Sequence, residues 1–400
     1  MKAVGNRGWR RVPRSVWALG FVSLLMDVSS EMIHALLPLL LVDSLGVGVA
    51  ALGVIEGIAK ATASVTKVFS GAISDRLGRR KPLLVLGYAL GAVSKPIFPL
   101  AGSGAVILAA RVADRFGKGV RGAPRDALVA DITPPEIRGA AYGLRQALDS
   151  IGAFAGPLLA VLLMLAYDGR IRGVLWWAVL PAVASVAVAA LAVHEPTGLV
   201  RTEHRGWPVR GRELSGLGGA FWVVVAIGVL FTLARFSEAF LILAGQAAGL
   251  PLALVPLVMV CMNAAYATGA MPAGALSDRL GRRGILIAGM LVLAGADLVL
   301  AAGFGIAGLF AGAALWGLHM ALSQGLLAAL VADCAPGALR ATAFGVFNLA
   351  TGLALLLASV VAGVLWQALG PAATLAAGGA FAVAAAGTMA LIPPQRLRAI

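Results

Sequence analysis

Long runs of apolar residues, separated by short polar loops, fill almost the whole chain. About 20 apolar residues in an α-helix span the hydrocarbon core of a bilayer. Twelve runs reach that length, six in each half of the sequence: 16–42, 50–74, 82–101, 104–130, 140–166, 173–193, 217–246, 250–276, 284–302, 305–332, 341–366 and 371–392. The pattern predicts an all-α membrane protein with twelve transmembrane helices.

Lys and Arg are concentrated in every second loop. The N-terminal tail, the loops 75–81 and 277–283, the segment 194–216 and the C-terminal end are basic, and among the alternate loops only 167–172 contains Arg. Short loops rich in Lys and Arg remain in the cytoplasm. We therefore expect a multi-pass protein of the bacterial inner membrane with both termini in the cytoplasm. The first run is too long for a signal peptide and is interpreted as a retained span.

Composition agrees with a lipid environment. Hydrophobic residues make up 60% of the chain and charged residues 12%, and the mean hydropathy is +0.93. The net charge of +14 does not indicate nucleic-acid binding, because the basic residues are scattered through short loops without interleaved aromatic residues. The two cysteines, Cys261 and Cys334, form no disulfide or metal motif. We expect no cofactor and no metal site.

A basic loop occurs twice. Residues Asp75–Arg80 have the same sequence as Asp278–Arg283, and Gly71 precedes the first copy as Gly274 precedes the second. Asp131 is likewise matched by Asp333, at an offset of 202 residues (333 − 131). Tandem halves of this length in a membrane chain are typical of secondary transporters. We expect a six-helix bundle in 1–193, a cytoplasmic linker in 194–216 and a second six-helix bundle in 217–400.

The first span has a polar stripe. Ser23, Asp27, Ser30, Glu31 and His34 lie within about 100° of arc on a helix. If the helix begins near residue 16, Asp27 lies ~16 Å deep and Glu31 ~22 Å deep. Desolvation at that depth favours the neutral form of a carboxyl group, so both are candidates for taking up and releasing a proton. The alternative is a permanent ion pair with arginines of the fourth span or with Lys60.

The fourth span has a larger charged stripe. Charged groups at bilayer depth are expected to be paired or to face an aqueous cavity. Within an arc of about 120° lie Arg111, Asp114, Arg115, Lys118, Arg121 and Arg125. The three residues nearest the cytoplasm, Lys118, Arg121 and Arg125, have the alternative of extending toward the interface.

Other polar residues inside spans are candidates for lining a cavity. They are Glu56, Lys60, Lys95, Asp149, Arg235, Glu238 and Asn348. The second half contributes few of them, so we expect proton chemistry and recognition of charged ligands to concentrate in the first half. In the fifth span, Gly143, Gly152, Gly156 and Pro157 predict a smooth face for close helix packing and a kink.

Twelve spans and a repeated Gly-x-x-x-Asp-Arg-x-Gly-Arg-Arg loop resemble the major facilitator superfamily along essentially the whole chain. The resemblance implies a bacterial permease similar to drug:proton antiporters, with an undefined substrate. It implies that Arg115 takes part in proton transfer, although Lys118 and Arg121 replace the usual glutamine and glycine of that motif. It also implies that the glycine pattern of the fifth span accompanies export by exchange, although the usual terminal glycine pair is replaced by Ala160 and Val161.

The resemblance further implies a conformational latch on the cytoplasmic side. The positions that match it are Gly71, Asp75, Arg76, Gly78, Arg79, Arg80, Asp131, Asp278, Gly281 and Arg282. An acidic residue at a helix end and several arginines can pair with neighbouring helix ends. For the arginines, the alternative is that they only set the topology of the chain.

The sequence therefore predicts a secondary active transporter, a proton-coupled antiporter that exports a small molecule by alternating access. Its expected partners are the substrate, protons and the lipid bilayer, and we expect a monomer. Two alternatives stay open: a carrier of organic anions or metal chelates, and a membrane sensor or scaffold that transports nothing. An enzyme is not expected, because the sequence contains neither His-Glu-x-x-His nor Gly-x-Ser-x-Gly, and no catalytic residue is assigned.

Overall fold

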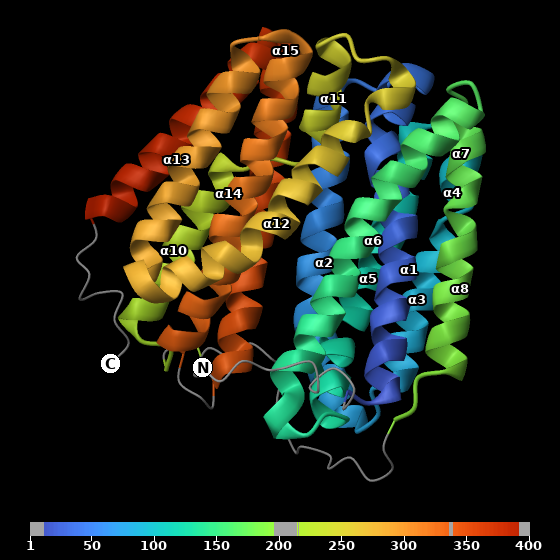
Figure 1. The fold of residues 1–400 in the computed structure, drawn as a ribbon, viewed down its shortest axis with the longest axis vertical. Helices are drawn as coiled ribbons and strands as arrows, with labels where there is room; N and C mark the ends of the chain where they lie inside the picture. Colours follow the sequence, from blue (N-terminus) through green and yellow to red (C-terminus); the bar gives the residue numbers. More distant parts are fainter. Residues whose placement is uncertain (1–11, 196–213, 215, 336–338, 392–400) are drawn as a thin grey trace. The chain divides into compact units, whose positions relative to one another are not determined.

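The computed structural model describes residues 12–195, 214, 216–335 and 339–391. All regular structure within these residues is helical (Figure 1). The helices are α1 (Arg14–Leu39), continued by a π-helical turn at Leu40–Ser44, α2 (Val49–Leu77), α3 (Lys81–Ser94), α4 (Ile97–Leu100), α5 (Gly104–Asp131), α6 (Arg138–Ala166), α7 (Ile171–Trp177), α8 (Val179–Leu191), α10 (Gly219–Ala234), α11 (Ala239–Ala247), α12 (Leu257–Leu280), α13 (Arg282–Ala301), α14 (Gly305–Cys334) and α15 (Arg340–Leu391).

These helices match the twelve predicted spans. Ten segments of the described chain are long and apolar enough to cross a membrane. Helix α5 is absent from these ten because of its many charges, although its length of 28 residues suffices for a bilayer. One segment, Thr342–Leu391, covers two predicted spans. It is interrupted at Gly370, where φ is +83°, a conformation that glycine adopts without strain.

Several predicted spans consist of two helices separated by a short break. The third span breaks at Lys95 and Pro96, between α3 and α4, and the sixth is divided at Ala178, between α7 and α8. The seventh breaks at Arg235–Glu238, between α10 and α11. Non-helical backbone at bilayer depth requires protein or water to satisfy its peptide groups. The break at Arg235–Glu238 is therefore a position where polar partners are required.

The chain divides into two compact units. Unit 1 contains the described residues within Met1–Leu36 and Thr62–Gly206, and unit 2 those within Leu37–Ala61 and Trp207–Ile400. This division differs from the expected boundary at the linker, because the first part of α2 packs with the second half of the chain. A Cβ atom at Gly53 would clash with the backbone oxygen of Ser359 on α15, and one at Gly57 would lie 2.7 Å from Leu356 Cδ1. Organisation into two six-helix bundles stays a prediction.

Each unit has its own apolar core. In unit 1, α3 packs against α5 and α8. The backbones of α3 and α5 approach closely at Gly87 and Gly117, where a Cβ at Gly117 would lie 2.6 Å from the Gly87 oxygen. In unit 2, α13 packs against α14 and α15, and α12 against α14. Small residues allow this close approach, which is the main source of packing energy between helices in lipid.

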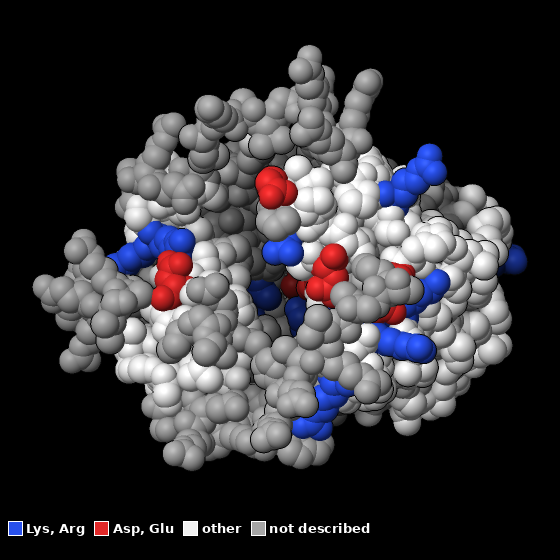
Figure 2. Space-filling model, turned by 90° about the horizontal axis from the view of Figure 1, so that it is seen from below, with Lys and Arg blue, Asp and Glu red and all other residues white. Residues whose placement is uncertain are grey.

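Lys, Arg, Asp and Glu side chains are exposed on the face that Figure 2 shows. Both copies of the repeated loop turn at a glycine in the left-handed region, with φ of +60° at Gly78 and +84° at Gly281. A side chain at either position would strain the backbone. The repeated glycine is therefore explained by the turn itself.

Candidate functional site

A buried ion network connects three helices of unit 1. Asp114 on α5 is 2% exposed, and its two carboxylate oxygens each contact a cation. Lys95 Nζ lies 2.8 Å from Oδ1, and Arg115 Nε lies 3.2 Å from Oδ2. Lys95 also donates to Ser30 Oγ on α1 at 2.9 Å. Because the carboxylate is shared by two cations and shielded from water, this Asp114 network is suited to fixing α1, α3 and α5 to one another rather than to exchanging protons.

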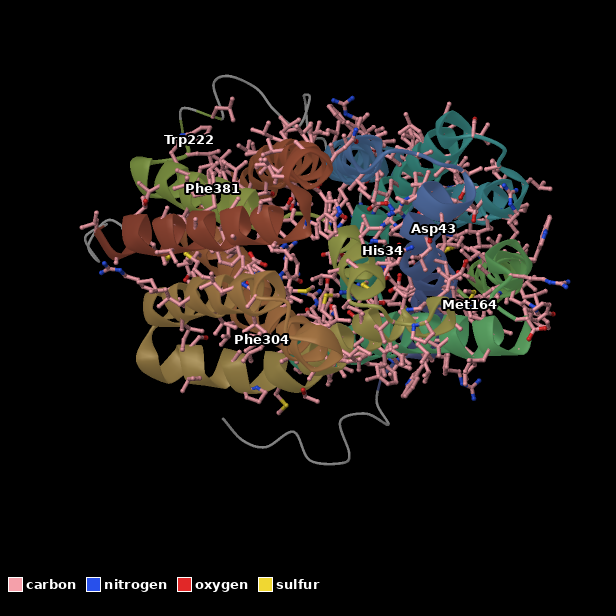
Figure 3. The ribbon with its side chains drawn as sticks, turned by 90° about the horizontal axis from the view of Figure 1, so that it is seen from above. His34, Asp43, Met164, Trp222, Phe304 and Phe381 are labelled. Atoms are coloured by element: carbon pink, nitrogen blue, oxygen red, sulfur yellow. The ribbon has the colours of Figure 1, made fainter. Side chains whose placement is uncertain are left out.

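The two carboxylates of α1 have a different environment. Asp27 and Glu31 are half-buried, and Lys118 on α5 is exposed. The charge of Lys118 interacts with those of both carboxylates. Glu31 Oε2 also lies 3.3 Å from Nδ1 of His34, which Figure 3 labels on the same helix. An exposed cation within a span cannot face acyl chains at low cost, so we expect these residues to face water rather than lipid.

Helix α6 presents its predicted glycine face to these carboxylates. A Cβ at Gly152 would lie 2.7 Å from the Leu24 oxygen and 3.0 Å from Asp27 Cβ. A Cβ at Gly156 would lie 2.8 Å from the Val28 oxygen and 2.9 Å from Glu31 Cβ. The two glycines therefore let α6 contact α1 at the acidic residues. Gly143 has no neighbour within 4 Å of its potential Cβ, so it does not share this contact.

Pro157 lies inside α6, which is described as one helix from Arg138 to Ala166. A proline removes one backbone hydrogen bond from a helix. The kink expected at this position stays a prediction.

A second ion network lies beside Asp27, between α5 and α6. Arg145 NH1 contacts Asp149 Oδ2 at 2.9 Å and Asp126 Oδ1 at 3.5 Å. Arg125 contacts the same two carboxylates at 3.8 Å and 3.2 Å and donates to Ser23 Oγ of α1 at 2.9 Å. The charges of these two arginines and two aspartates balance. Asp149 therefore belongs to this network, whereas the sequence identified it only as a cavity candidate.

Unit 2 contains its own charged cluster at the break between α10 and α11. Lys60 of α2 forms an ion pair with Glu238. Glu56, fully buried one turn before Lys60, accepts a hydrogen bond from Ser237 Oγ at 3.3 Å. Charged side chains inside the spans are thus found in unit 2 as well as in unit 1, and where charged ligands bind stays a prediction. The part of the first half that takes part here, Leu37–Ala61, belongs to unit 2 by its contacts.

The remaining cavity candidates are distributed over both units. Arg111 on α5 is 1% exposed. Arg235, in the break, and Asn348 on α15 are half-buried. Arg111 belongs to unit 1 and the other two to unit 2. The described residues contain no group of three or more His, Cys, Asp or Glu side chains placed to hold a metal ion.

The repeated loops form ion pairs with the matched aspartates. Arg80 Nε lies 3.2 Å from Asp131 Oδ2, and Arg282 pairs with Asp333. In the first copy the pairing arginine is Arg80, not Arg79, which is exposed. By the sequence repeat Arg282 corresponds to Arg79, so the two copies use different arginines.

Other latch positions are placed as follows. Arg76 is exposed, and a Cβ at Gly71 would lie 3.3 Å from Ala123 Cβ of α5. The side chains of Asp75 and Asp278 lie outside the described residues. The latch therefore stays a prediction at these two positions.

Glu195 joins this loop, although the sequence placed it in the linker without a role. Its carboxylate accepts hydrogen bonds from the backbone N–H groups of Arg80 and Lys81, the latter at 3.3 Å. These groups belong to the N-terminus of α3, which has no side-chain cap of its own. An acidic group stabilises such an end through the free N–H groups and the helix dipole. No local signal identifies this cap, because 114 residues separate Glu195 from Lys81.

Comparison with known proteins identifies the family. The family model described as Major Facilitator Superfamily matches residues 19–246 and 223–399. The uncharacterized MFS-type transporter MJ1317 of Methanocaldococcus jannaschii is 32% identical over 376 residues, which cover 90% of this chain and 91% of that protein. The chain belongs to the major facilitator superfamily.

Membership of the major facilitator superfamily makes the chain a multi-pass membrane transporter of undefined substrate. A multidrug resistance protein, MdtH of Cronobacter sakazakii, is 32% identical over 149 residues, only 37% of each chain. The crystal structure of a POT family transporter in complex with 5-aminolevulinic acid matches with a TM-score of 0.81 at 14% identity, covering 96% of this chain and 97% of that one. At that identity the likeness concerns the fold alone.

Proposed function

We propose that this transporter is a proton-coupled antiporter that exports a small molecule by alternating access. The observation that supports it is the half-buried pair Asp27 and Glu31 beside the exposed Lys118 in unit 1. The partial similarity to a multidrug resistance protein agrees with export. We further propose the bacterial cytoplasmic membrane as its location, with both termini in the cytoplasm, as the basic loops indicate.

In this proposal, substrate and proton compete for the face that contains Asp27 and Glu31. Two carboxylates one helical turn apart disfavour double ionisation, so one of them readily accepts a proton. Protonation removes a charge that Lys118 otherwise balances. Proton binding can change the balance between inward-open and outward-open states only if the two states bind the proton with different affinities. The close contact of α6 with α1 at Gly152 and Gly156 would transmit the change to a second helix.

Transport in everted vesicles with an imposed pH gradient tests this function. Ethidium serves as a cationic probe and fluorescein as an anionic probe. We expect Asp27→Asn and Glu31→Gln each to reduce proton-driven uptake at least tenfold while the protein remains folded. Asp43→Asn is the control, because Asp43 is exposed and bonded to Gln246 at the end of α1. Undiminished transport in both variants would exclude these carboxylates as proton carriers.

A carrier of organic anions or metal chelates is the second candidate, favoured by one observation. Helix α5 has five cations along its polar stripe, whereas Asp114 is its one acidic residue there. Lys118 is exposed and available to a negative ligand. Transport of fluorescein but not of ethidium, lost in Lys118→Gln, would favour this candidate. A sensor or scaffold would transport neither probe and show no counterflow.

A further inference from the structure

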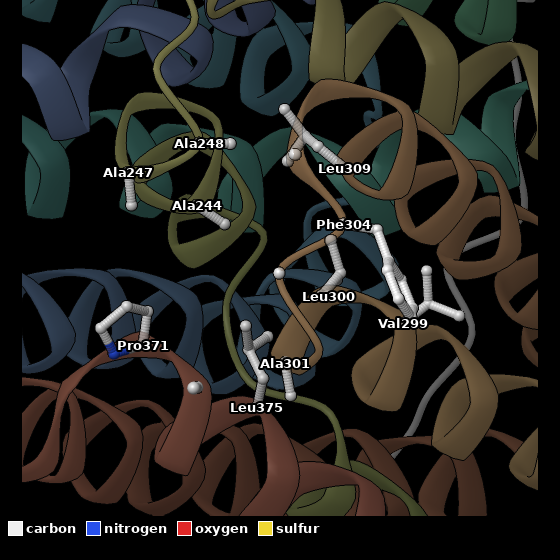
Figure 4. Close-up of a pocket in the computed structure, with 13 residues that line it drawn as sticks. Ala244, Ala247, Ala248, Val299, Leu300, Ala301, Phe304, Leu309, Pro371 and Leu375 are labelled. Atoms are coloured by element: carbon white, nitrogen blue, oxygen red, sulfur yellow. The ribbon is translucent and has the colours of Figure 1, made fainter.

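Unit 2 contains an apolar pocket at the end that the sequence places outside the cytoplasm. Its volume is about 190 Å³, which is room for several water molecules. The ends of α11 and α13, the start of α14 and the part of α15 after Gly370 surround it (Figure 4). The last carbonyl groups of α11 and α13 lie here, and helix C-termini attract positive charge through such groups.

A buried carboxyl group lies near this pocket and has no role in the proposed transport chemistry. Asp297 on α13 has no exposed surface. Its Oδ1 accepts a hydrogen bond from Trp316 Nε1 at 2.8 Å, whereas the buried Oδ2 has no hydrogen-bond partner in the structure. A Cβ at Gly378 of α15 would lie 2.7 Å from Oδ2. The absence of a side chain at Gly378 therefore makes room for this oxygen.

Helix periodicity connects the carboxyl group to the pocket. On α13, Leu300 and Ala301 follow Asp297 by three and four residues, so all three share one face. On α15, Gly378 follows Leu375 by three residues, and again the two share a face. Leu300, Ala301 and Leu375 all line the pocket. Asp297 and Gly378 therefore lie about one helical turn below its floor.

The charged groups around Asp297 are few. Helix α11 and the described part of α15 after Gly370 contain no titratable residue. On the neighbouring α14, His319 is buried, and its Nδ1–H group donates to the Gly289 oxygen at 3.0 Å. The break contains Arg235 and Glu238. Cys261 and Tyr266 are the titratable residues on the membrane part of α12.

On α13 itself, the nearest basic residue in sequence is Arg283, 14 residues (297 − 283) and thus ~21 Å away. The structure shows no cation in contact with Asp297 among the described residues. Burying a carboxylate with one hydrogen bond and no counter-ion costs much more free energy than burying the neutral acid.

We propose that Asp297 is a proton-binding site of unit 2 that exchanges its proton with the outer compartment through this pocket. Trp316 holds the neutral carboxyl group through Oδ1, and Oδ2 carries the proton. Trp316 also lies 5.5 Å from the ring of Phe236 in the break between α10 and α11. The proton state of Asp297 is thereby connected to the segment that positions Glu238. This site is distinct from Asp27 and Glu31 and does not depend on them.

Infrared spectroscopy of the full-length protein in lipid nanodiscs tests the proton. A protonated carboxyl group has a carbonyl stretching band that an ionised one lacks. In the wild-type minus Asp297→Asn difference spectrum at neutral pH, we expect one such band, and none in the wild-type minus Asp43→Asn spectrum. Trp316→Phe should shift the band by removing the hydrogen bond at Oδ1. A difference spectrum without the band would overturn the proposal. So would a protein that Na⁺ alone stabilises against unfolding, if Asp297→Asn abolishes that stabilisation.

The route is tested by the rate at which this band shifts after transfer into D₂O. Ala301→Phe fills the pocket, so we expect deuterium exchange at Asp297 to slow at least fivefold while the band persists. Leu298→Phe is the matched control, because Leu298 is 57% exposed on another face of the same helix. Equal rates in both variants would overturn the route. No transported compound is needed, so failure here is distinguishable from failure of the proposed antiport function.

Discussion

At the scale of single residues, environment separates carboxylates that look alike in the sequence. Asp27 and Asp114 both lie within predicted spans beside several cations. Asp114 is enclosed with Lys95 and Arg115, whereas Asp27 is half-buried near an exposed lysine. A buried carboxylate shared by two cations holds its negative charge, and losing it leaves two positive charges without their partner.

We therefore predict that Asp114→Asn destabilises the protein by about 3–5 kcal/mol, the usual cost of breaking a buried pair. The measurement is thermal unfolding in detergent, followed by tryptophan fluorescence. Adding Lys95→Met to Asp114→Asn should recover part of the loss, since one uncompensated charge is removed. If Asp114→Asn unfolds at the same temperature as the wild type, the network does not stabilise the fold.

The sequence could identify these residues but not their partners. The periodicity of α1 and α5 indicated a polar face on each helix. Pairing of Asp114 with Lys95 depends on how α3 crosses α5, which is fixed at Gly87 and Gly117 and has no local signal. The ion pair of Lys60 with Glu238 was missed for the same reason, because 178 residues separate the two. In contrast, Arg145 and Asp149 are four residues apart, and helical spacing alone predicts their contact.

At the scale of helices, the length of the apolar runs was sufficient to locate the spans. The breaks were less evident, because the polar residues in the segment 217–246 are only Thr232, Arg235, Ser237, Glu238 and Gln246. The assignment of the first part of α2 to unit 2 was not foreseen either. Contacts of Gly53 and Gly57 with α15 explain it. The chain contains so many glycines that no single one indicates from the sequence where two helices pack closely.

We predict that Gly53→Ala destabilises the protein by about 1–3 kcal/mol, because the methyl group has no space and α2 must move away from Ser359. Gly295→Ala on α13 is the matched control. Nothing lies within 4 Å of a Cβ at Gly295, so alanine should be neutral or stabilise the helix by up to about 1 kcal/mol. Thermal unfolding of both variants measures this difference. Equal effects would mean that close approach at Gly53 is unimportant.

At the scale of the whole molecule, the repeated loop is identical in sequence in its two copies, whereas its contacts differ between them. Arg80 contacts Asp131 and Ser74, and its backbone N–H group donates to Glu195. In the second copy, the side chains of Arg282 and Asp333 are 32% and 50% exposed. Exposed ion pairs contribute little to stability.

The two copies should consequently respond differently to the same substitution. We predict that Asp333→Asn changes the free energy of unfolding by less than about 1 kcal/mol, whereas Asp131→Asn has a larger effect. The effect of Asp131→Asn should decrease in an Arg80→Gln background and not in an Arg79→Gln background. A double-mutant cycle on unfolding midpoints measures this coupling. Coupling to Arg79 instead would contradict the assignment of Arg80.

The charges of α5 have a consequence for biosynthesis. A nascent segment enters the bilayer from the translocon according to its own hydrophobicity, and a central Arg, Lys or Asp opposes insertion by about 2.5–3.5 kcal/mol each. Helix α5 contains several such residues, so it should not partition into lipid alone. Lys95, which contacts Asp114 in the folded protein, and Ser30, which contacts Lys95, reach the membrane earlier during synthesis. We therefore expect α1 and α3 to remain beside the translocon until α5 is synthesised and packs against them. The order of synthesis is then part of how this transporter is assembled.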